Sequence, residues 1–184
     1  RLILETSALY QVENAAIAIR ACEALMQECG FGQLHVRDGI KSMRWPGRME
    51  EIRPNVYIDG AHNEDGIEAF VYSLKNAADL AHCMLIFSVV RDKQYDKMIE
   101  RLCSLDMVTE YVLTNIPDER GAKLSVIADR FRKYTDKEVH VFEQIEDAVS
   151  YCLHKRNRLV RDIYIVGSLY LAGAVRKLLE QQSG

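Results

Sequence analysis

The residues best suited to chemistry lie in a loop at positions 59–63, which reads Asp-Gly-Ala-His-Asn. An apolar run precedes this loop and a segment of helical length follows it. Asp59 could therefore accept hydrogen bonds from ribose hydroxyls or bind a metal, and His62 with the helix amides could bind phosphate. In a purely structural interpretation, Asn63 is the N-cap of the helix and Asp59 fixes the turn. The residue types and their spacing leave both interpretations open.

A second loop, at positions 167–173, reads Gly-Ser-Leu-Tyr-Leu-Ala-Gly and follows the last apolar run. Its Gly-Ser pair could offer backbone amides to an anion, although an ordinary turn with Ser168 as N-cap is the simpler interpretation. Arg44 and Arg48 flank a Trp-Pro-Gly turn, where an arginine could meet phosphate or ribose. Taken alone, these arginines are more simply explained as solvated surface residues.

Several known catalytic and nucleotide-binding motifs are missing from the sequence. There is no G-x-x-x-x-G-K-[ST] phosphate loop, no G-x-G-x-x-G dinucleotide motif and no G-x-S-x-G nucleophile elbow. The five cysteines form no C-x-x-C pair, which favours free thiols in a reducing compartment over a disulfide framework or a zinc site. No residue of the chain is assigned as a metal ligand. We interpret His82 and His140 as partly buried structural residues, and His35 and His154 as surface residues.

The composition is that of an ordinary globular protein. The 184 residues include 24 Lys and Arg against 27 Asp and Glu, a net charge of −3, and 48% are apolar. With nearly balanced charges, the chain as a whole is not expected to attract nucleic acid or an anionic membrane. No apolar run approaches the roughly 20 residues that span a bilayer. No signal-peptide pattern is present, so we expect a cytoplasmic protein without nucleic-acid or membrane partners. Because the sequence starts at Arg1 and runs directly into a helical pattern, we expect a fragment of a larger protein or a processed chain.

Hydrophobic patterning predicts the elements that hold these loops. Short apolar runs alternate with amphipathic segments of helical length, which predicts an α/β fold with a mainly parallel, Rossmann-like sheet and helices on both faces. The predicted strands are 56–58, 84–90, 111–113, 139–142 and 163–166, with 49–52 as an extra edge strand. The predicted helices between and after them are 64–79, 94–105, 122–133, 145–156 and 169–181. In such sheets ligands bind beyond the carboxyl ends of the strands, where both loops fall.

Two further helices, 11–28 and 34–43, come before this pattern, and the turn-rich segment 44–48 separates them from it. We place a domain boundary at this hinge. The first helix carries an apolar stripe that includes Ile17, Ile19, Leu25 and Met26. We predict that the stripe is partly exposed because its packing partner is missing.

Four motifs, in order, resemble those of folylpolyglutamate synthase, which is often bifunctional with dihydrofolate synthase and belongs to the Mur ligase superfamily. They are Y-Q-V-E-N-A-A at 10–16, W-P-G-R-M-E at 45–50, D-G-A-H-N at 59–63 and G-S-L-Y-L-A-G at 167–173. The resemblance implies that residues 1–44 are the last helices and linker of an ATPase domain. Residues 45–184 would form the C-terminal glutamate-ligase domain. The implied reaction is ATP-dependent addition of L-glutamate to folate through an acyl phosphate.

The resemblance also implies roles for individual residues around ATP. Gln11 and Asn14 would lie near the adenine. Arg48 and Asp59 would contact the phosphate and the ribose, and His62 would act in catalysis near the terminal phosphate.

Ser168 and Tyr170 would border the site of the glutamate substrate. Two positions depart from the family pattern: Tyr10 stands where superfamily members often have His, and Ala174 stands where the folate enzymes commonly have Glu. The second departure weakens the implied roles at the end of the glutamate loop.

The same resemblance places the phosphate loop, the Mg²⁺ ligands and a carbamylated lysine in an N-terminal ATPase domain upstream of Arg1. We therefore expect this chain to fold alone without ligase activity. Two alternatives remain. One is another Mur-type amino-acid ligase, such as a cell-wall enzyme. The other is a non-catalytic α/β nucleotide-binding module of receiver or nucleotide-sensing type. A receiver needs acidic residues at strand ends and a lysine after a later strand; Asp59 and Asp92 follow strands, but no lysine is suitably placed.

Overall fold

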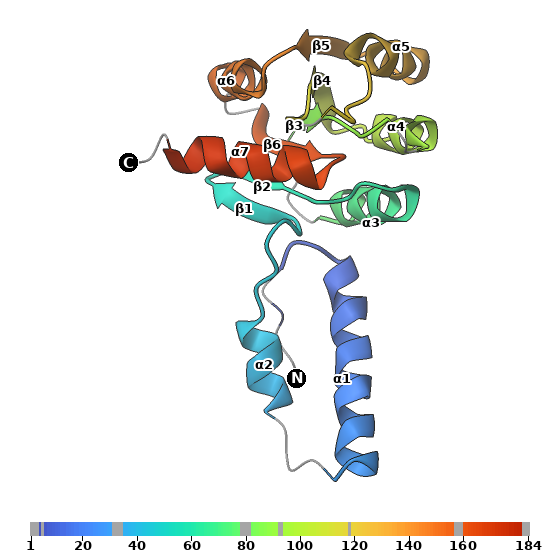
Figure 1. The fold of residues 1–184 in the computed structure, drawn as a ribbon, viewed down its shortest axis with the longest axis vertical. Helices are drawn as coiled ribbons and strands as arrows, with labels where there is room; N and C mark the ends of the chain where they lie inside the picture. The colour runs from blue at the N-terminus through green and yellow to red at the C-terminus, as the bar shows by residue number, and fades with distance from the viewer. Residues whose placement is uncertain are drawn as a thin grey trace.

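The computed structural model describes residues 4, 6–30, 35–77, 82–91, 94–117, 119–156 and 160–181. It consists of an α/β body from which a two-helix arm extends (Figure 1). Asp92, which the sequence analysis placed after a strand, lies outside the described residues.

The body is built on a six-stranded sheet of order β1-β2-β6-β3-β4-β5. β1 pairs with β2 in the antiparallel direction, and the other neighbouring strands are parallel. The mainly parallel α/β fold and the extra edge strand are therefore confirmed. The strands are β1 Glu50–Arg53, β2 Val56–Ile58, β3 His82–Phe87, β4 Val108–Thr114, β5 Glu138–Phe142 and β6 Val160–Val166.

Helices cover both faces of the sheet, as the continuous apolar strands predict. Along β3, Leu85 and Phe87 belong to one hydrophobic cluster and Met84 and Ile86 to another, so alternate side chains fill two cores. The first core is closed by α3 Glu64–Lys75, α4 Tyr95–Cys103 and α5 Leu124–Tyr134. The second is closed by α6 Ile145–Lys155 and α7 Leu169–Gln181.

Four predicted strand boundaries are wrong by two or three residues, and one of them is the start of β3 at His82 and not at Met84. β3 ends at Phe87 and not at Val90, because Val90 leaves the parallel ladder and forms an isolated antiparallel bridge with Gly121. β4 and β6 begin three residues before their apolar runs, since their polar first halves still pair with neighbouring strands. His82 is exposed at the start of β3, so the prediction that it is partly buried is also wrong.

The arm consists of α1 Tyr10–Glu28 and α2 Val36–Ser42, which lie side by side away from the sheet (Figure 1). Only Gln11 and Ala15 of α1 are buried, while Ile17 is 68% and Leu25 46% exposed. The predicted exposed stripe is thus confirmed. Leu34, the predicted start of the second helix, lies outside the described residues. None of the helices within these described residues is both long and apolar enough to cross a membrane.

The arm joins the body through the residues around the start of α1. The Ser7 hydroxyl donates to the Met49 carbonyl at 3.0 Å, and the Leu9 amide donates to the Ser73 hydroxyl at 3.1 Å. Side-chain hydrogen bonds of this kind fix the direction in which the helix leaves the body. Tyr10, the first residue of α1, contacts Asp59, so the joint lies next to the loop that follows β2.

Candidate functional site

Asp59 lies directly after β2 and is 2% exposed. One carboxylate oxygen accepts hydrogen bonds from the Tyr10 hydroxyl at 2.7 Å and from the Met49 amide at 2.9 Å. The other oxygen accepts from the Ala61 amide at 2.8 Å. Asp59 thus connects the start of α1, the hinge before β1 and its own turn.

Burial raises the pKa of the Asp59 carboxyl above its ordinary value. Its hydrogen bonds from Tyr10, Ala61 and Met49 act in the opposite direction but do not outweigh desolvation. Burial of the Tyr10 hydroxyl and the negative charge of Asp59 together raise the pKa of Tyr10. The phenol therefore keeps its proton and acts as a hydrogen-bond donor. In this arrangement Asp59 braces the joint, which is the structural role that the sequence had left open.

His62 is half-buried, three residues further along the loop. Its Nδ1 lies 2.8 Å from the Gly60 carbonyl oxygen, which can only accept, so Nδ1 carries the proton. In the neutral ring this bond leaves Nε2 as an acceptor and fixes the orientation of the imidazole. The geometry suits a group that contacts an anionic ligand when protonated or moves a proton when neutral.

Asn63 is the N-cap of α3. Its side-chain oxygen accepts from the Gly66 amide at 2.8 Å, which satisfies one of the free amides at the start of the helix. Glu64 and Asp65 occupy the first turn. Their charges compete with any anion at this helix end, so Arg48 and His62 must supply the positive charge in a phosphate site here.

A cavity of about 350 Å³ opens between α1, the hinge and the loop after β2. It collects four of the sequence-predicted site residues from three separate segments, namely Asn14, Arg48, Asp59 and His62. The cavity lies where doubly wound sheets bind ligands, beyond the carboxyl end of a parallel strand.

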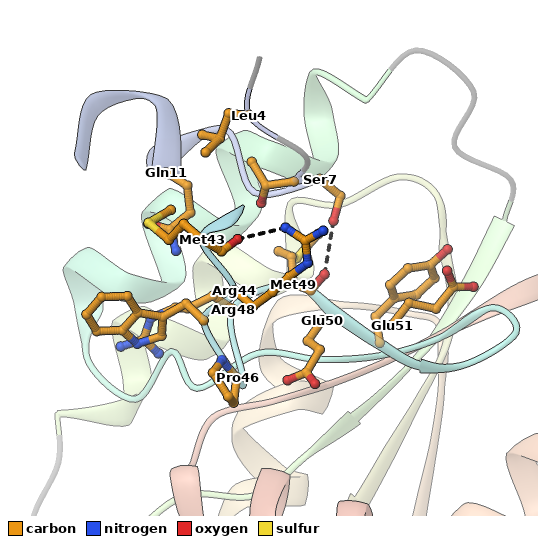
Figure 2. Close-up of a pocket in the computed structure, with 13 residues that line it drawn as sticks. Leu4, Ser7, Gln11, Met43, Arg44, Pro46, Arg48, Met49, Glu50 and Glu51 are labelled. Carbon is orange, nitrogen blue, oxygen red and sulfur yellow. Dashed lines mark hydrogen bonds between the residues drawn. The ribbon is translucent and has the colours of Figure 1, made fainter. Parts of the chain in front are cut away.

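A neighbouring cavity of about 440 Å³ is lined by the hinge and by residues around the start of α1 (Figure 2). Gln11 lines it and is 5% exposed, with its side-chain oxygen accepting from the Asn14 amide group at 2.8 Å. Arg48 lines both cavities. Arg44 lines the larger cavity too, and its guanidinium donates to the carbonyls of Lys41 and Met43 at 3.2 and 3.0 Å, which supports the hinge backbone.

Ser168 is 3% exposed and its hydroxyl accepts from the Tyr170 amide at 3.1 Å, at the start of α7. The loop lies against the first site, because the Gly167 amide donates to the Ala61 carbonyl at 3.0 Å. Tyr170 is 45% exposed, and its hydroxyl accepts from Arg120, whose guanidinium lies 5.0 Å from the ring centre. The structure therefore keeps Ser168 and Tyr170 together but outside the cavity that holds His62.

The sequence does not indicate two of these contacts. Tyr10 departs from a family pattern, but an aromatic residue at this position does not by itself reveal the hydrogen bond to Asp59 across the joint. Arg120 lies in a loop after β4 with no motif to mark it. Arg120 follows β4 and Tyr170 follows β6, and these two strands pair in parallel with opposite edges of β3. The segments after them therefore end on the same side of the sheet, where the two side chains meet.

Fold and site together define the class: an α/β domain of doubly wound type with a ligand-sized cavity beyond the carboxyl end of β2. Residues 47–167 match the family model described as "Mur ligase, glutamate ligase domain". The chain belongs to this family.

Curated relatives extend the match beyond the domain. The chain is 30% identical over 177 residues to "Dihydrofolate synthase/folylpolyglutamate synthase" of Bacillus subtilis, covering 93% of this chain and 39% of that protein. It is 32% identical over 176 residues to "Folylpolyglutamate synthase" of Lacticaseibacillus casei, covering 92% and 38%. The chain thus spans well under half of the length of these relatives.

Solved structures show the same fold. A Mycobacterium tuberculosis folylpolyglutamate synthase complexed with ADP and AMPPCP superposes with a TM-score of 0.84 at 27% identity, over 96% of this chain and 41% of that one. An E. coli FolC structure in complex with DHPP and ADP has a TM-score of 0.80 at 20% identity, over 93% and 39%. The second likeness supports the fold alone.

Proposed function

We propose that this chain is the glutamate-ligase part of an ATP-dependent enzyme that adds L-glutamate to folate. The observation that carries the proposal is the cavity in which Asn14 of α1, Arg48 of the hinge and His62 of the β2 loop come together. Its support is the family match and the folylpolyglutamate and dihydrofolate synthases among the relatives.

We propose further that residues 1–44 belong to an ATPase domain and its linker, and that residues 45–184 form the ligase domain. The exposed stripe of α1 supports this division, because a helix with only two buried residues lacks most of the packing that normally stabilises it. In the complete enzyme that stripe would pack against the rest of the ATPase domain.

The proposed reaction joins a folate carboxylate to the amine of glutamate. A carboxylate oxygen of folate takes the terminal phosphoryl group of ATP, which gives an acyl phosphate and ADP. The glutamate amine then attacks the acyl carbon, loses a proton, and phosphate leaves as the amide forms. The protein must neutralise the phosphates in the first step and orient the amine in the second.

Arg48 and His62 are the groups we assign to the phosphates. Arg48 lines both cavities, so its guanidinium can reach phosphate oxygens from a nucleotide whose base lies toward Gln11 and Asn14. In its protonated form His62 would donate from Nε2–H to the terminal phosphate, while Nδ1–H donates to the Gly60 carbonyl.

Asp59 acts on the nucleotide indirectly in this proposal. Asp59 is almost completely buried and already accepts hydrogen bonds from Tyr10, Met49 and Ala61, which leaves little access for a ribose. We therefore assign Asp59 to holding the loop that carries His62.

The glutamate substrate is assigned to the neighbouring α7 loop. Tyr170 and Arg120 lie together at its exposed side, where a guanidinium can meet a carboxylate of the amino acid. Ser168 sets the start of α7 and thereby the position of Tyr170.

A bound magnesium ion would neutralise part of the negative charge of the ATP phosphates. We propose that its protein ligands come from the ATPase domain. Within the described ranges, the cavity brings together no group of three His, Cys, Asp or Glu side chains able to hold a metal ion. Asp59 is already satisfied by protein donors, which leaves Asp65 as the exposed carboxylate on the cavity wall. These residues do not form a complete magnesium site by themselves.

The proposal is tested by the acceptor that the complete enzyme uses. Purified enzyme is incubated with ATP, L-glutamate and either a reduced folate, dihydropteroate or a UDP-sugar peptide, and ADP and the amide product are measured. Amide formation on folate supports the assignment. Amide formation only on the UDP-sugar peptide would identify a cell-wall Mur-type ligase, and nucleotide binding without any turnover would identify a binding module.

A further inference from the structure

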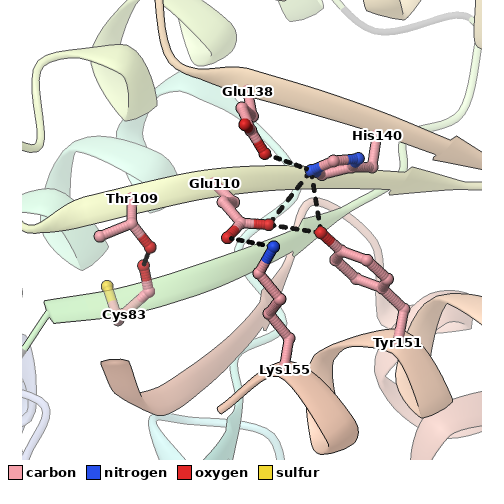
Figure 3. A network of polar contacts seen from close by, with 7 residues as sticks. All are labelled: Cys83, Thr109, Glu110, Glu138, His140, Tyr151 and Lys155. Carbon is pink, nitrogen blue, oxygen red and sulfur yellow. Dashed lines mark hydrogen bonds and ion pairs between the residues drawn. The ribbon is translucent and has the colours of Figure 1, made fainter. Parts of the chain in front are cut away.

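A second polar cluster lies away from the candidate nucleotide site, near the amino ends of β4 and β5 (Figure 3). Glu110 of β4 and Glu138 of β5 are direct partners in the parallel register. His140 follows Glu138 by two residues and therefore lies on the same face of the strand. Two carboxylates and an imidazole converge there from neighbouring strands.

The atoms of this cluster surround the His140 Nε2 atom. It lies 3.1 Å from a carboxylate oxygen of Glu110 and 3.1 Å from one of Glu138. A single N–H cannot fully satisfy both charged acceptors. Like charges directly opposite on neighbouring strands also destabilise a sheet, so the pairing of these two glutamates favours a cation between them.

The Tyr151 hydroxyl of α6 orients Glu110, donating to the same oxygen at 2.7 Å. The same hydroxyl lies 3.0 Å from the His140 Nε2 atom, so Tyr151 contacts both side chains and fixes their relative position. Lys155 lies 3.5 Å from the other Glu110 oxygen. Glu110 is only 9% exposed, and these contacts hold it in place with one oxygen turned toward His140.

We propose that Glu110, Glu138 and His140 bind a divalent first-row transition metal of the zinc class, which clips the edge strand β5 to β4. Imidazole nitrogen and carboxylate oxygen are both zinc ligands, and a water would complete four-coordination. Bonds of about 2.0–2.2 Å in a tetrahedron place ligand atoms about 3.3–3.6 Å apart, slightly more than the separations from Nε2. Magnesium and calcium are disfavoured because they prefer all-oxygen ligands.

Binding requires only small changes in the chain. The proton on Nε2 must move to Nδ1 or be released, because the metal takes the Nε2 lone pair. The three ligand atoms lie within 4.8 Å of one another. The Glu138 side chain is 68% exposed, so it can rotate toward the metal without disturbing the core.

Calorimetric titration with ZnSO₄ tests the site without nucleotide or folate, so its outcome is independent of the proposed ligase activity. The exposed thiol of Cys29 could itself bind zinc, and all measurements therefore use the full chain with Cys29→Ser. We expect one site with a dissociation constant of about 1–10 µM. Cobalt(II) should give the visible absorption of a four-coordinate ion with nitrogen and oxygen ligands, without thiolate charge-transfer bands.

Variants assign the ligands. Glu138→Gln keeps the size of an exposed side chain and should weaken zinc binding by at least about tenfold, and His140→Asn should weaken it by about a hundredfold. Glu146→Gln, an exposed carboxylate in the first turn of α6, should leave binding unchanged. If the His140 variant does not fold, the zinc affinity of the Glu138 variant alone tests the site. No one-site binding, or affinity that Glu138→Gln does not change, would overturn the proposal.

Discussion

The Tyr10 hydroxyl donates a hydrogen bond of 2.7 Å to the buried Asp59 carboxylate, across 49 residues of sequence. Tyr10 is the first residue of α1 and Asp59 follows β2, so this bond joins the arm to the body at the edge of the candidate nucleotide site. The orientation of α1 and the shape of the His62 loop are therefore linked through one pair of side chains.

Removing this hydroxyl should destabilise the fold. Tyr10→Phe leaves the buried Asp59 oxygen with one donor fewer, which we expect to cost about 1–3 kcal/mol of unfolding free energy. The measurement is urea unfolding followed by circular dichroism. Tyr72→Phe is the matched control, because Tyr72 is 58% exposed. Equal stability of the two variants would mean that the Tyr10 bond does not brace the joint.

The raised pKa of Asp59 predicts a pH dependence of stability. The folded chain holds the Asp59 proton to higher pH than the unfolded chain, whose carboxyl has the ordinary value near 3.8. The contribution of Asp59 to stability is therefore complete below that value and is lost as pH rises through the folded pKa.

We expect the difference in unfolding free energy between the native chain and Asp59→Asn to fall across this window and to become level above it. Unfolding curves at closely spaced pH values give the difference, and carboxyl NMR gives the pKa directly. A measured Asp59 pKa below its ordinary value would show that the hydrogen bonds to the carboxylate outweigh the effect of burial.

Gly60 has no room for a side chain. A Cβ at this position would run into the Leu169 side chain and would lie 2.7 Å from the Arg48 guanidinium and 3.3 Å from the Gly47 carbonyl oxygen. Both side chains are flexible at their ends, so Gly60→Ala should cost about 1 kcal/mol of stability and displace Arg48 from its place between the two cavities.

Gly39→Ala is its control, since a Cβ there meets nothing within 4 Å and the position lies inside α2. It should be neutral or stabilise by up to about 1 kcal/mol. Thermal unfolding measures the stability of both variants against the native chain. If the Gly60→Ala chain is as stable as the Gly39→Ala chain, the loop can move aside to make room for the added methyl group.

The exposed arm should open more readily than the sheet. Beyond Ala15, the side chains of α1 are exposed or half-buried, whereas Leu85 and Ile86 of β3 are fully buried. In the monomeric chain, amide exchange in residues 17–28 should therefore be faster than in β3. Mass spectrometry of deuterated peptides measures both segments, and slower exchange in the arm would argue against a lost packing partner.

The sequence predicted the order and type of the elements well, because five of the strands read as continuous apolar runs between amphipathic helices. It failed at boundaries where polar residues take part in the sheet, as with Glu110 and Asp162, since backbone pairing does not depend on side-chain polarity. At the site, the motifs brought out Asn14, Arg48 and His62. The placement of Asp59 in a buried network could not be read from spacing, because its donors Tyr10 and Met49 come from other segments.

His62 is the residue on which the proposed phosphoryl-transfer step depends most directly. Folate- and glutamate-dependent ADP formation by the complete enzyme is compared for the native protein, His62→Ala and the exposed control His154→Ala, with melting temperatures measured in parallel. We predict that His62→Ala lowers kcat roughly ten- to a hundredfold, as expected for loss of a charge-assisted hydrogen bond, while the melting temperature and the His154→Ala variant stay close to the native values. A folded His62→Ala enzyme with native kcat would contradict the placement of this loop at the reacting phosphate.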